Sequence, residues 1–148
     1  MPPALPPQGP ADWPATLARI EDSFGRQTMM RTMGAALQVV APGEVQVTAP
    51  IADHLLQQHG AAHAGMAFTL GDSAAGYAAL SLMPADAEVM TVEMKINLLS
   101  PAVGDRLLAI GKVVRAGKRL SVVQAEVFAI KDDSRKAIAL LQGTMIPV

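Results

Sequence analysis

Polar and apolar positions alternate with a period of two in the second half of the chain. Val92, Met94, Ile96 and Leu98 are separated by single polar residues, a pattern that is typical of a strand with one apolar face. Three further strand-like segments follow, each bounded by residues that favour turns: 105–117, 118–133 and 134–148. We therefore expect four long antiparallel strands, joined by hairpins as a meander.

Helical spacing replaces this alternation near the N-terminus. Leu17, Ile20 and Phe24 place apolar side chains on one face of a segment that Asp12 can cap and Gly34 can end. This pattern predicts an amphipathic helix that lies against the rest of the fold.

A hairpin is expected after this helix. The sequence APGE, residues 41–44, separates two short runs with strand character. Residues 51–62 then indicate a short helical turn followed by a loop that contains glycine. The hairpin supplies two strands in addition to the four that follow.

A long apolar segment runs from Ala64 to about Met83, just before Pro84. Apolar or small residues cover every face of it, which predicts a helix surrounded by protein. At 1.5 Å per residue this helix would be roughly 30 Å long. The predicted fold class is α+β, an antiparallel sheet wrapped around one long central helix, plus the N-terminal helix. Since the sheet covers one side of the central helix, something else must cover the other.

Asp72 is the single charged residue between Asp53 and Asp86. A buried carboxylate costs free energy unless hydrogen bonds or opposite charges compensate it. We interpret Asp72 as a functional carboxylate. The alternative is a structural acid that bonds to a neighbouring hydroxyl or backbone group.

Composition limits the number of domains and the kinds of partner. The chain has 148 residues, of which 51% are hydrophobic and 17% charged, and suits a single domain over residues 11–148 after a flexible proline-rich arm over residues 1–10. A net charge of −1 gives no general attraction to nucleic acid. Without cysteine, a signal peptide or a bilayer-spanning segment, we expect a cytoplasmic protein with no membrane attachment and no metal site.

Two segments carry a resemblance to a known family. GAAHAGMAFTLGDSAAGYAA and TVEMKINLLSP resemble the hotdog-fold acyl-CoA thioesterases of the hydroxybenzoyl-CoA and phenylacetate-degradation (PaaI-like) type. In that family a His-Gly-Gly sequence opens the central helix, an Asp follows nine residues after the His, and a strand reads Thr-x5-Asn-x3-Pro. His63, Asp72, Thr91, Asn97 and Pro101 fall in register with this pattern. The resemblance covers roughly residues 35–147, nearly the whole predicted domain.

The resemblance also implies roles for particular residues. Asp72 corresponds to the catalytic carboxylate of the family, and the backbone N–H of Ala64 or Gly65 to the oxyanion donor. Thr91 corresponds to a hydroxyl that helps to hold the nucleophilic water. Gln57 takes the place of an Asn that polarises or positions the thioester.

The sequence departs from the family pattern at two positions. Ala64 replaces the first Gly of His-Gly-Gly, which a backbone donor tolerates. Gln57 keeps the amide of the family's Asn but lengthens its reach, and Gln58 or His59 is an alternative for its role. His63 either orients the turn into the helix or takes part directly in catalysis.

Helix geometry constrains how these residues can cooperate. Ala64 and Asp72 are eight residues apart, about 12 Å along one helix, whereas groups that act together must lie within hydrogen-bond reach of one reacting centre. Antiparallel pairing of two such helices would bring Asp72 of one chain near Ala64 of the other. The resemblance likewise implies a homodimer, often paired again into a homotetramer. We therefore expect Gln57 and Ala64 of one subunit to work with Asp72 and Thr91 of its partner.

The function predicted on these grounds is hydrolysis of a small, medium or aryl acyl-CoA to the free acid and CoA. Asp72 would act as general base or as nucleophile, with coenzyme A present only as part of the substrate and no separate cofactor. The alternatives are a non-catalytic acyl-CoA-binding hotdog module, a hotdog hydratase or dehydratase, and a structural dimerisation domain.

Basic residues are concentrated towards the C-terminus. Residues 95–148 hold nine basic and four acidic side chains, against three and nine in residues 1–94. Arg115, Lys118 and Arg119 surround one predicted turn and could meet the phosphates of coenzyme A. An ordinary solvated hairpin is an equal alternative.

Overall fold

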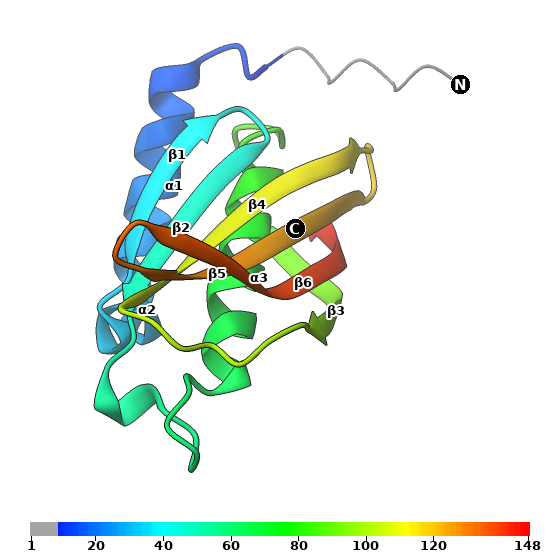
Figure 1. Cartoon of the computed structure of the whole chain (residues 1–148). Coiled ribbons are helices and arrows are strands. Elements are labelled where there is room, and N and C mark those ends of the chain that lie inside the picture. Colours follow the sequence, from blue (N-terminus) through cyan, green and yellow to red (C-terminus); the bar gives the residue numbers. More distant parts are fainter. Residues whose placement is uncertain (1–8) are drawn as a thin grey trace.

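The computed structural model describes residues 9–148 (Figure 1). Residues 1–8 of the predicted arm lie outside this range, and Gly9 and Pro10 belong to neither a helix nor a strand. The helices are α1 (Trp13–Arg26), α2 (Thr28–Met33), the short 3-10 helix η1 (Asp53–Leu55) and α3 (Ala64–Leu80). The strands are β1 (Ala36–Ala41), β2 (Glu44–Pro50), β3 (Val89–Leu98), β4 (Arg106–Ala116), β5 (Ser121–Lys131) and β6 (Ser134–Pro147). Along this part of the chain, no helix combines the length and apolar character needed to cross a membrane.

The six strands form one antiparallel sheet in the order β1-β2-β4-β5-β6-β3. This sheet, wrapped around α3, confirms the predicted fold class and three of the four predicted hairpins, those that join β1 to β2, β4 to β5 and β5 to β6. The four-strand meander is wrong in one respect, because β3 pairs with β6 at the sheet edge and not with β4. The connection from β3 to β4 crosses the end of the sheet, where the carbonyl of Ala102 accepts a hydrogen bond from the N–H of Ala62. Alternation predicts a strand but does not identify its neighbour.

The sheet packs closely on α3, which runs behind it in Figure 1. Leu70, Ala74 and Ala78 of the helix are fully buried. Gly111 of β4 lies so near the helix that a Cβ there would be 2.3 Å from the carbonyl carbon of Ala74. Only glycine allows this approach of the two backbones, which brings β4 against the middle of α3.

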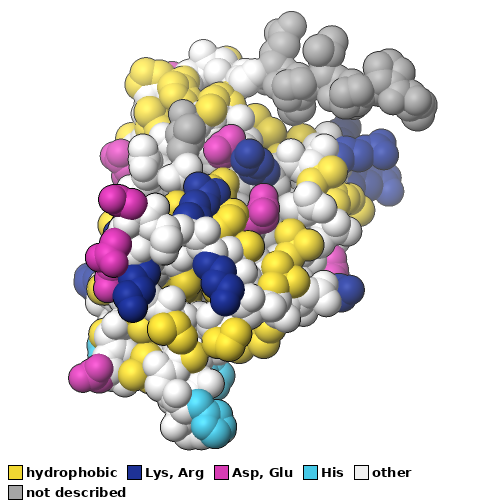
Figure 2. Space-filling view, viewed as in Figure 1, with side chains coloured by type: hydrophobic (Ala, Val, Ile, Leu, Met, Phe, Trp, Pro, Cys, Tyr) yellow, Lys and Arg dark blue, Asp and Glu magenta, His cyan; other side chains and the backbone are white. Residues whose placement is uncertain are grey.

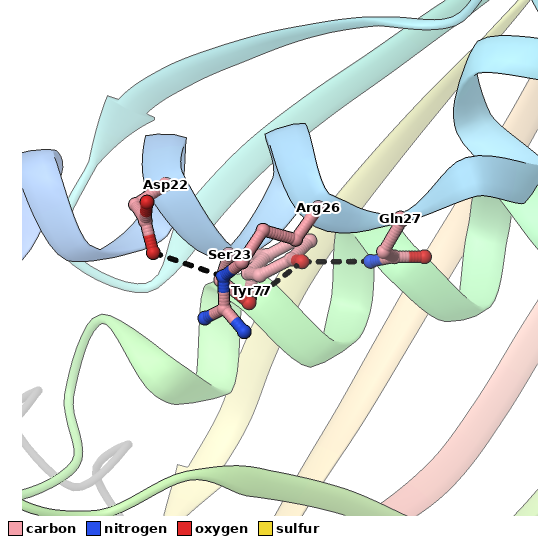
Figure 3. A network of polar contacts seen from close by, with 5 residues as sticks. All are labelled: Asp22, Ser23, Arg26, Gln27 and Tyr77. Atoms are coloured by element: carbon pink, nitrogen blue, oxygen red, sulfur yellow. Dashed lines mark hydrogen bonds and ion pairs between the residues drawn. The ribbon is translucent and has the colours of Figure 1, made fainter.

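The second half of α3 is covered on its other side by α1 (Figure 3). The hydroxyl of Tyr77 accepts a hydrogen bond from the side-chain amide of Gln27 at 2.7 Å and lies 3.1 Å from the hydroxyl of Ser23. Phe24 packs edge-on against the Tyr77 ring, with 6.1 Å between the ring centroids. The guanidinium of Arg19 donates to the carbonyl oxygens of Leu80, Pro84, Ala85 and Ala87. These contacts fix α1 against α3.

The first half of α3 has a face that α1 and the sheet cover only in part. Gly65 is exposed, and Phe68, Thr69, Asp72 and Ser73 are half-buried. Their spacing of three and four residues places them on one side of the helix. A helix enclosed on every side is therefore found only in its second half, from Ala74 to Leu80, within a single chain.

Two helix boundaries differ from the prediction. The N-terminal helix is interrupted at Gln27, whose backbone is extended (φ −75°, ψ 103°) while its side chain bonds to Tyr77. The central helix ends at Leu80 instead of near Met83, because the hydroxyl of Ser81 donates to a carbonyl of the last turn. In both places side-chain hydrogen bonds compete with continuation of the helix.

Candidate active site

Asp72 opens onto a cavity of about 340 Å³ between α3, α1 and the start of β3. The hydroxyl of Thr91 donates a hydrogen bond to Oδ1 of Asp72 at 2.8 Å. The residues that line the cavity are mostly polar: Ser23, Arg26, Gln27, Asp72, Ser73, Gly76, Tyr77, Glu88, Val89 and Thr91. The lone charge of the central helix therefore faces a cavity and not the apolar core.

The surroundings of Asp72 have opposing effects on its carboxylate. Burial raises the pKa of Asp72 above its ordinary value, because desolvation penalises the charged form. The hydrogen bond from Thr91 acts in the opposite direction, since it stabilises the carboxylate. The net result is a carboxyl group that binds a proton more readily than an exposed one, as a general base requires.

A bulge in β3 turns Thr91 towards α3. The pairing of β3 with β6 shifts between Thr91 and Glu93, so Val92 is the extra residue. Val92 is 58% exposed, whereas Met94 after the bulge packs against the core. Simple alternation predicted that Val92 and Met94 lie on the same apolar face of the strand. The bulge separates them, so this prediction is wrong for Val92.

A second cavity, of about 410 Å³, lies at the N-terminal end of α3. It is lined mostly by apolar residues: Gln57, Ala61, Ala62, Ala64, Ala67, Leu98, Leu99, Ser100, Pro101, Ala102 and Ile138. The side-chain oxygen of Gln57 accepts a hydrogen bond from the backbone N–H of His59. The amide NH₂ of Gln57 is the donor end of this side chain.

His63 is the N-cap residue of α3. Its ring Nδ1 accepts a hydrogen bond from the N–H of Gly65 at 2.8 Å. The backbone N–H of His63 donates to the carbonyl of Leu55. The N–H of Gly65 is therefore engaged, whereas Ala64, as the first helical residue, has no partner for its N–H within the helix. Of the two predicted oxyanion donors, the geometry favours Ala64.

Six of the predicted site residues thus fall into three pairs within one chain, each pair at its own cavity. Asp72 and Thr91 share the polar cavity, and Gln57 and Ala64 share the apolar cavity. His63 and Gly65 line a third cavity, of about 260 Å³, with Met66 and other residues. The separation of Ala64 from Asp72 follows from their spacing of eight positions on one helix.

The predicted phosphate contacts are exposed. Arg115, Lys118 and Arg119 lie at the β4–β5 hairpin, and none of them lines the cavities described above. Figure 2 shows Lys and Arg side chains gathered at this hairpin, in the upper right of the view. Among residues 9–148, no group of three His, Cys, Asp or Glu side chains is arranged to hold a metal ion.

Several residues of the Asp72 cavity were missed by the sequence analysis. Ser23 and Arg26 come from α1, Gln27 from the break between α1 and α2, and Glu88 from the segment just before β3. On an amphipathic helix such polar residues are typical of a solvated face. The spacing of Ser23 and Gln27, one helical turn apart, was the available signal, but nothing in it identifies the residue on α3 that they meet.

Comparisons with known proteins identify the class. The arrangement of sheet and helix, with the isolated acid on the helix, is that of a hotdog-fold thioesterase, and a family model described as the thioesterase superfamily matches residues 59–135. A thioesterase family protein from Silicibacter pomeroyi is 42% identical, covers 90% of this chain and 98% of its own, and superposes with a TM-score of 0.88. The chain belongs to the thioesterase superfamily and is a thioester hydrolase.

Two further solved structures are similar. A conserved protein from Pseudomonas aeruginosa is 30% identical, with 82% of this chain and 94% of that chain covered and a TM-score of 0.74. The PaaI protein from the phenylacetic acid degradation operon of E. coli is 23% identical over 92% of this chain and 95% of its own, with a TM-score of 0.81. At that identity the PaaI structure supports the fold alone.

Proposed function

We propose that the protein is an acyl-CoA thioesterase that hydrolyses a small, medium or aryl acyl-CoA in a site shared between two subunits. The observation that carries this proposal is the polar cavity in which Thr91 donates to Asp72. A half-buried carboxylate with one hydroxyl partner suits a general base better than a structural acid, which would have its oxygens fully bonded.

Dimer formation is supported by what a single chain leaves uncovered. One face of the first half of α3 carries Asp72 and its half-buried neighbours. β3 is one of the two edge strands of the sheet, and its apolar residues Met90, Val92 and Leu98 are exposed. An isologous dimer with antiparallel α3 helices and adjoining β3 edges would cover both features. Pairing of two such dimers into a tetramer is a further part of the proposal.

The proposed reaction uses one group from each half of the site. Asp72 takes a proton from water while the water oxygen bonds to the thioester carbonyl carbon. The N–H of Ala64 from the other subunit, assisted by the amide of Gln57, donates to the developing oxyanion. Collapse breaks the C–S bond, and the leaving thiolate takes the proton from Asp72, giving the free acid and CoA. Direct attack by Asp72, through an anhydride that water then hydrolyses, is the alternative.

Three features of the site bear on the competing functions. His63 bonds to the N–H of Gly65 and not to a carboxylate among the described residues, so the His–acid pair of a hydratase is not supported. Arg115, Lys118 and Arg119 form an exposed basic group, which supports a role in holding the phosphates of CoA. No cofactor beyond the substrate's own CoA enters the scheme.

A thiol-release assay over a panel of acyl-CoAs tests the function. We expect turnover of at least one compact acyl-CoA, with free CoA and free acid formed in equal amounts. Acetyl, butanoyl, octanoyl, benzoyl and phenylacetyl groups span the sizes in question. Tight binding of acyl-CoA without release of thiol would instead indicate the non-catalytic binding module, and hydration of an enoyl-CoA would indicate a hydratase.

Thr91→Val should move the pH profile of the enzyme. Because the Thr91 hydroxyl lowers the pKa of Asp72, its removal should raise that pKa further. The acidic limb of the kcat/KM profile should then shift to higher pH, with a several-fold loss on that limb. Thr91→Ser keeps the hydroxyl and should restore the original limb. An unchanged limb in Thr91→Val would show that Asp72 is not the group titrating there.

A further inference from the structure

Gly76 is the one glycine of α3 at which an added Cβ would make no close contact within this chain. A Cβ at Gly71 would lie 2.9 Å from the side chain of Leu141, and one at Gly65 would lie 3.0 Å from the ring of the N-cap histidine. A Cβ at Gly76 would meet only Cε of Met145, at the ordinary contact distance of 3.8 Å. Alanine stabilises a helix interior better than glycine does. Contacts within this chain therefore do not explain a glycine at position 76.

The space that Gly76 leaves belongs to the Asp72 cavity. Gly76 is buried, lines that cavity and lies one helical turn after Asp72 on the same face of α3. The rise of four residues is about 6 Å. If the thioester carbonyl lies beside Asp72, the atoms a few bonds beyond that carbonyl lie beside Gly76.

The far wall of the cavity is fixed. The hydroxyl of Tyr77 is held by Gln27 and lies next to Ser23 (Figure 3). All three residues line the cavity together with Gly76. Tyr77 is 4% exposed, and its ring packs edge-on against Phe24. A wall held by these contacts sets a limit to the size of the group in front of it.

Charge decides which part of an acyl-CoA this cavity suits. Asp72 and Glu88 both line it, and the one basic lining residue, Arg26, is paired with Asp22 at 3.0 Å. With two acidic residues and an arginine that is already paired, this cavity is unfavourable for the negatively charged phosphates of CoA. The apolar cavity, in contrast, reaches Leu99, which is 55% exposed, and so opens to the surface for an extended pantetheine arm.

We propose that the Asp72 cavity holds the acyl group and that Gly76 is the specificity-determining residue for its size. The absence of a side chain at position 76 provides room for a compact acyl group, such as a ring or a short branched chain, in front of the Tyr77 wall. This inference rests on the proposed function, because it places the reacting carbonyl beside Asp72.

Gly76→Ala tests the proposal in the full chain. The added methyl group should lower the ratio of kcat/KM for phenylacetyl-CoA over acetyl-CoA by roughly 10- to 200-fold. Gly25→Ala is the matched control, because it makes the same change in α1, where a Cβ meets nothing within 4 Å. The control should leave the ratio unchanged, and the thermal midpoints of both variants should not fall.

Val89→Ala supplies a second variant with the opposite expectation. Val89 lines the same cavity, so its truncation should raise the phenylacetyl-to-acetyl ratio. A Gly76→Ala enzyme that loses equal activity on every acyl-CoA would overturn the inference, since the cavity would then hold the CoA arm common to all of them. An unchanged ratio would overturn it as well. A wild-type enzyme that cleaves no acyl-CoA would show instead that the proposed function itself is wrong.

Discussion

Replacing Asp72 with Asn should lower kcat by about 10²- to 10⁴-fold, the range that loss of a general acid–base group typically produces. The amide keeps the size of the carboxyl group and an oxygen that can accept the hydrogen bond from Thr91. It cannot take a proton from water, so binding of acyl-CoA should survive while release of thiol is lost. Steady-state kinetics and a binding titration of the same variant separate the two effects.

Stability provides the control for Asp72→Asn. Because burial raises the pKa of Asp72, the ionised carboxylate is less favourable in the folded than in the unfolded chain. The contribution of this group to stability is therefore fully present below its unfolded pKa and is lost as pH rises through its folded pKa. At neutral pH the Asn variant should melt at the same temperature as wild type or higher. A variant that melts lower and keeps its activity would mean that Asp72 is structural.

The order of elements and the cavity-facing position of the candidate acid, Asp72, leave local signals in the sequence. A charge on an otherwise apolar helix stands out in the sequence, and its cost on burial requires an explanation. The Ala64–Asp72 spacing likewise predicted that one chain cannot bring both residues to one centre, and the structure places them in separate cavities.

The remaining features depend on long-range contacts that no local pattern records. The position of β3 beside β6 is determined by the crossing of residues 99–105 over the sheet end, and the bulge at Val92 by the pairing that results. The sequence also left Ala64 and Gly65 as equal oxyanion donors. Only the direction of the His63 ring, towards the N–H of Gly65, distinguishes them.

Ala64→Pro should lower kcat by about 10²- to 10³-fold, the usual effect of removing one oxyanion donor. Proline is favoured at the first position of a helix, where the missing N–H has no helical partner to lose. The preceding residue, His63, has φ −60° and ψ 141°, a conformation that proline tolerates before it. The substitution therefore removes the proposed donor with little change to α3. Ala64→Gly keeps the N–H and should retain most of the activity, and equal kcat values for the two variants would exclude this N–H as the donor.

Mixing the two inactive variants tests whether the site is shared. In a dimer of one Asp72→Asn chain and one Ala64→Pro chain, a shared site would combine the intact Asp72 of one with the intact Ala64 N–H of the other. Random association makes half of the dimers mixed, each with one of its two sites intact, so co-expression should restore about a quarter of wild-type activity. If each site were built within one chain, every site would contain one of the two substitutions. The mixture would then be as inactive as either variant alone. The quarter-activity result thus requires the antiparallel pairing of α3 that the helix spacing implies.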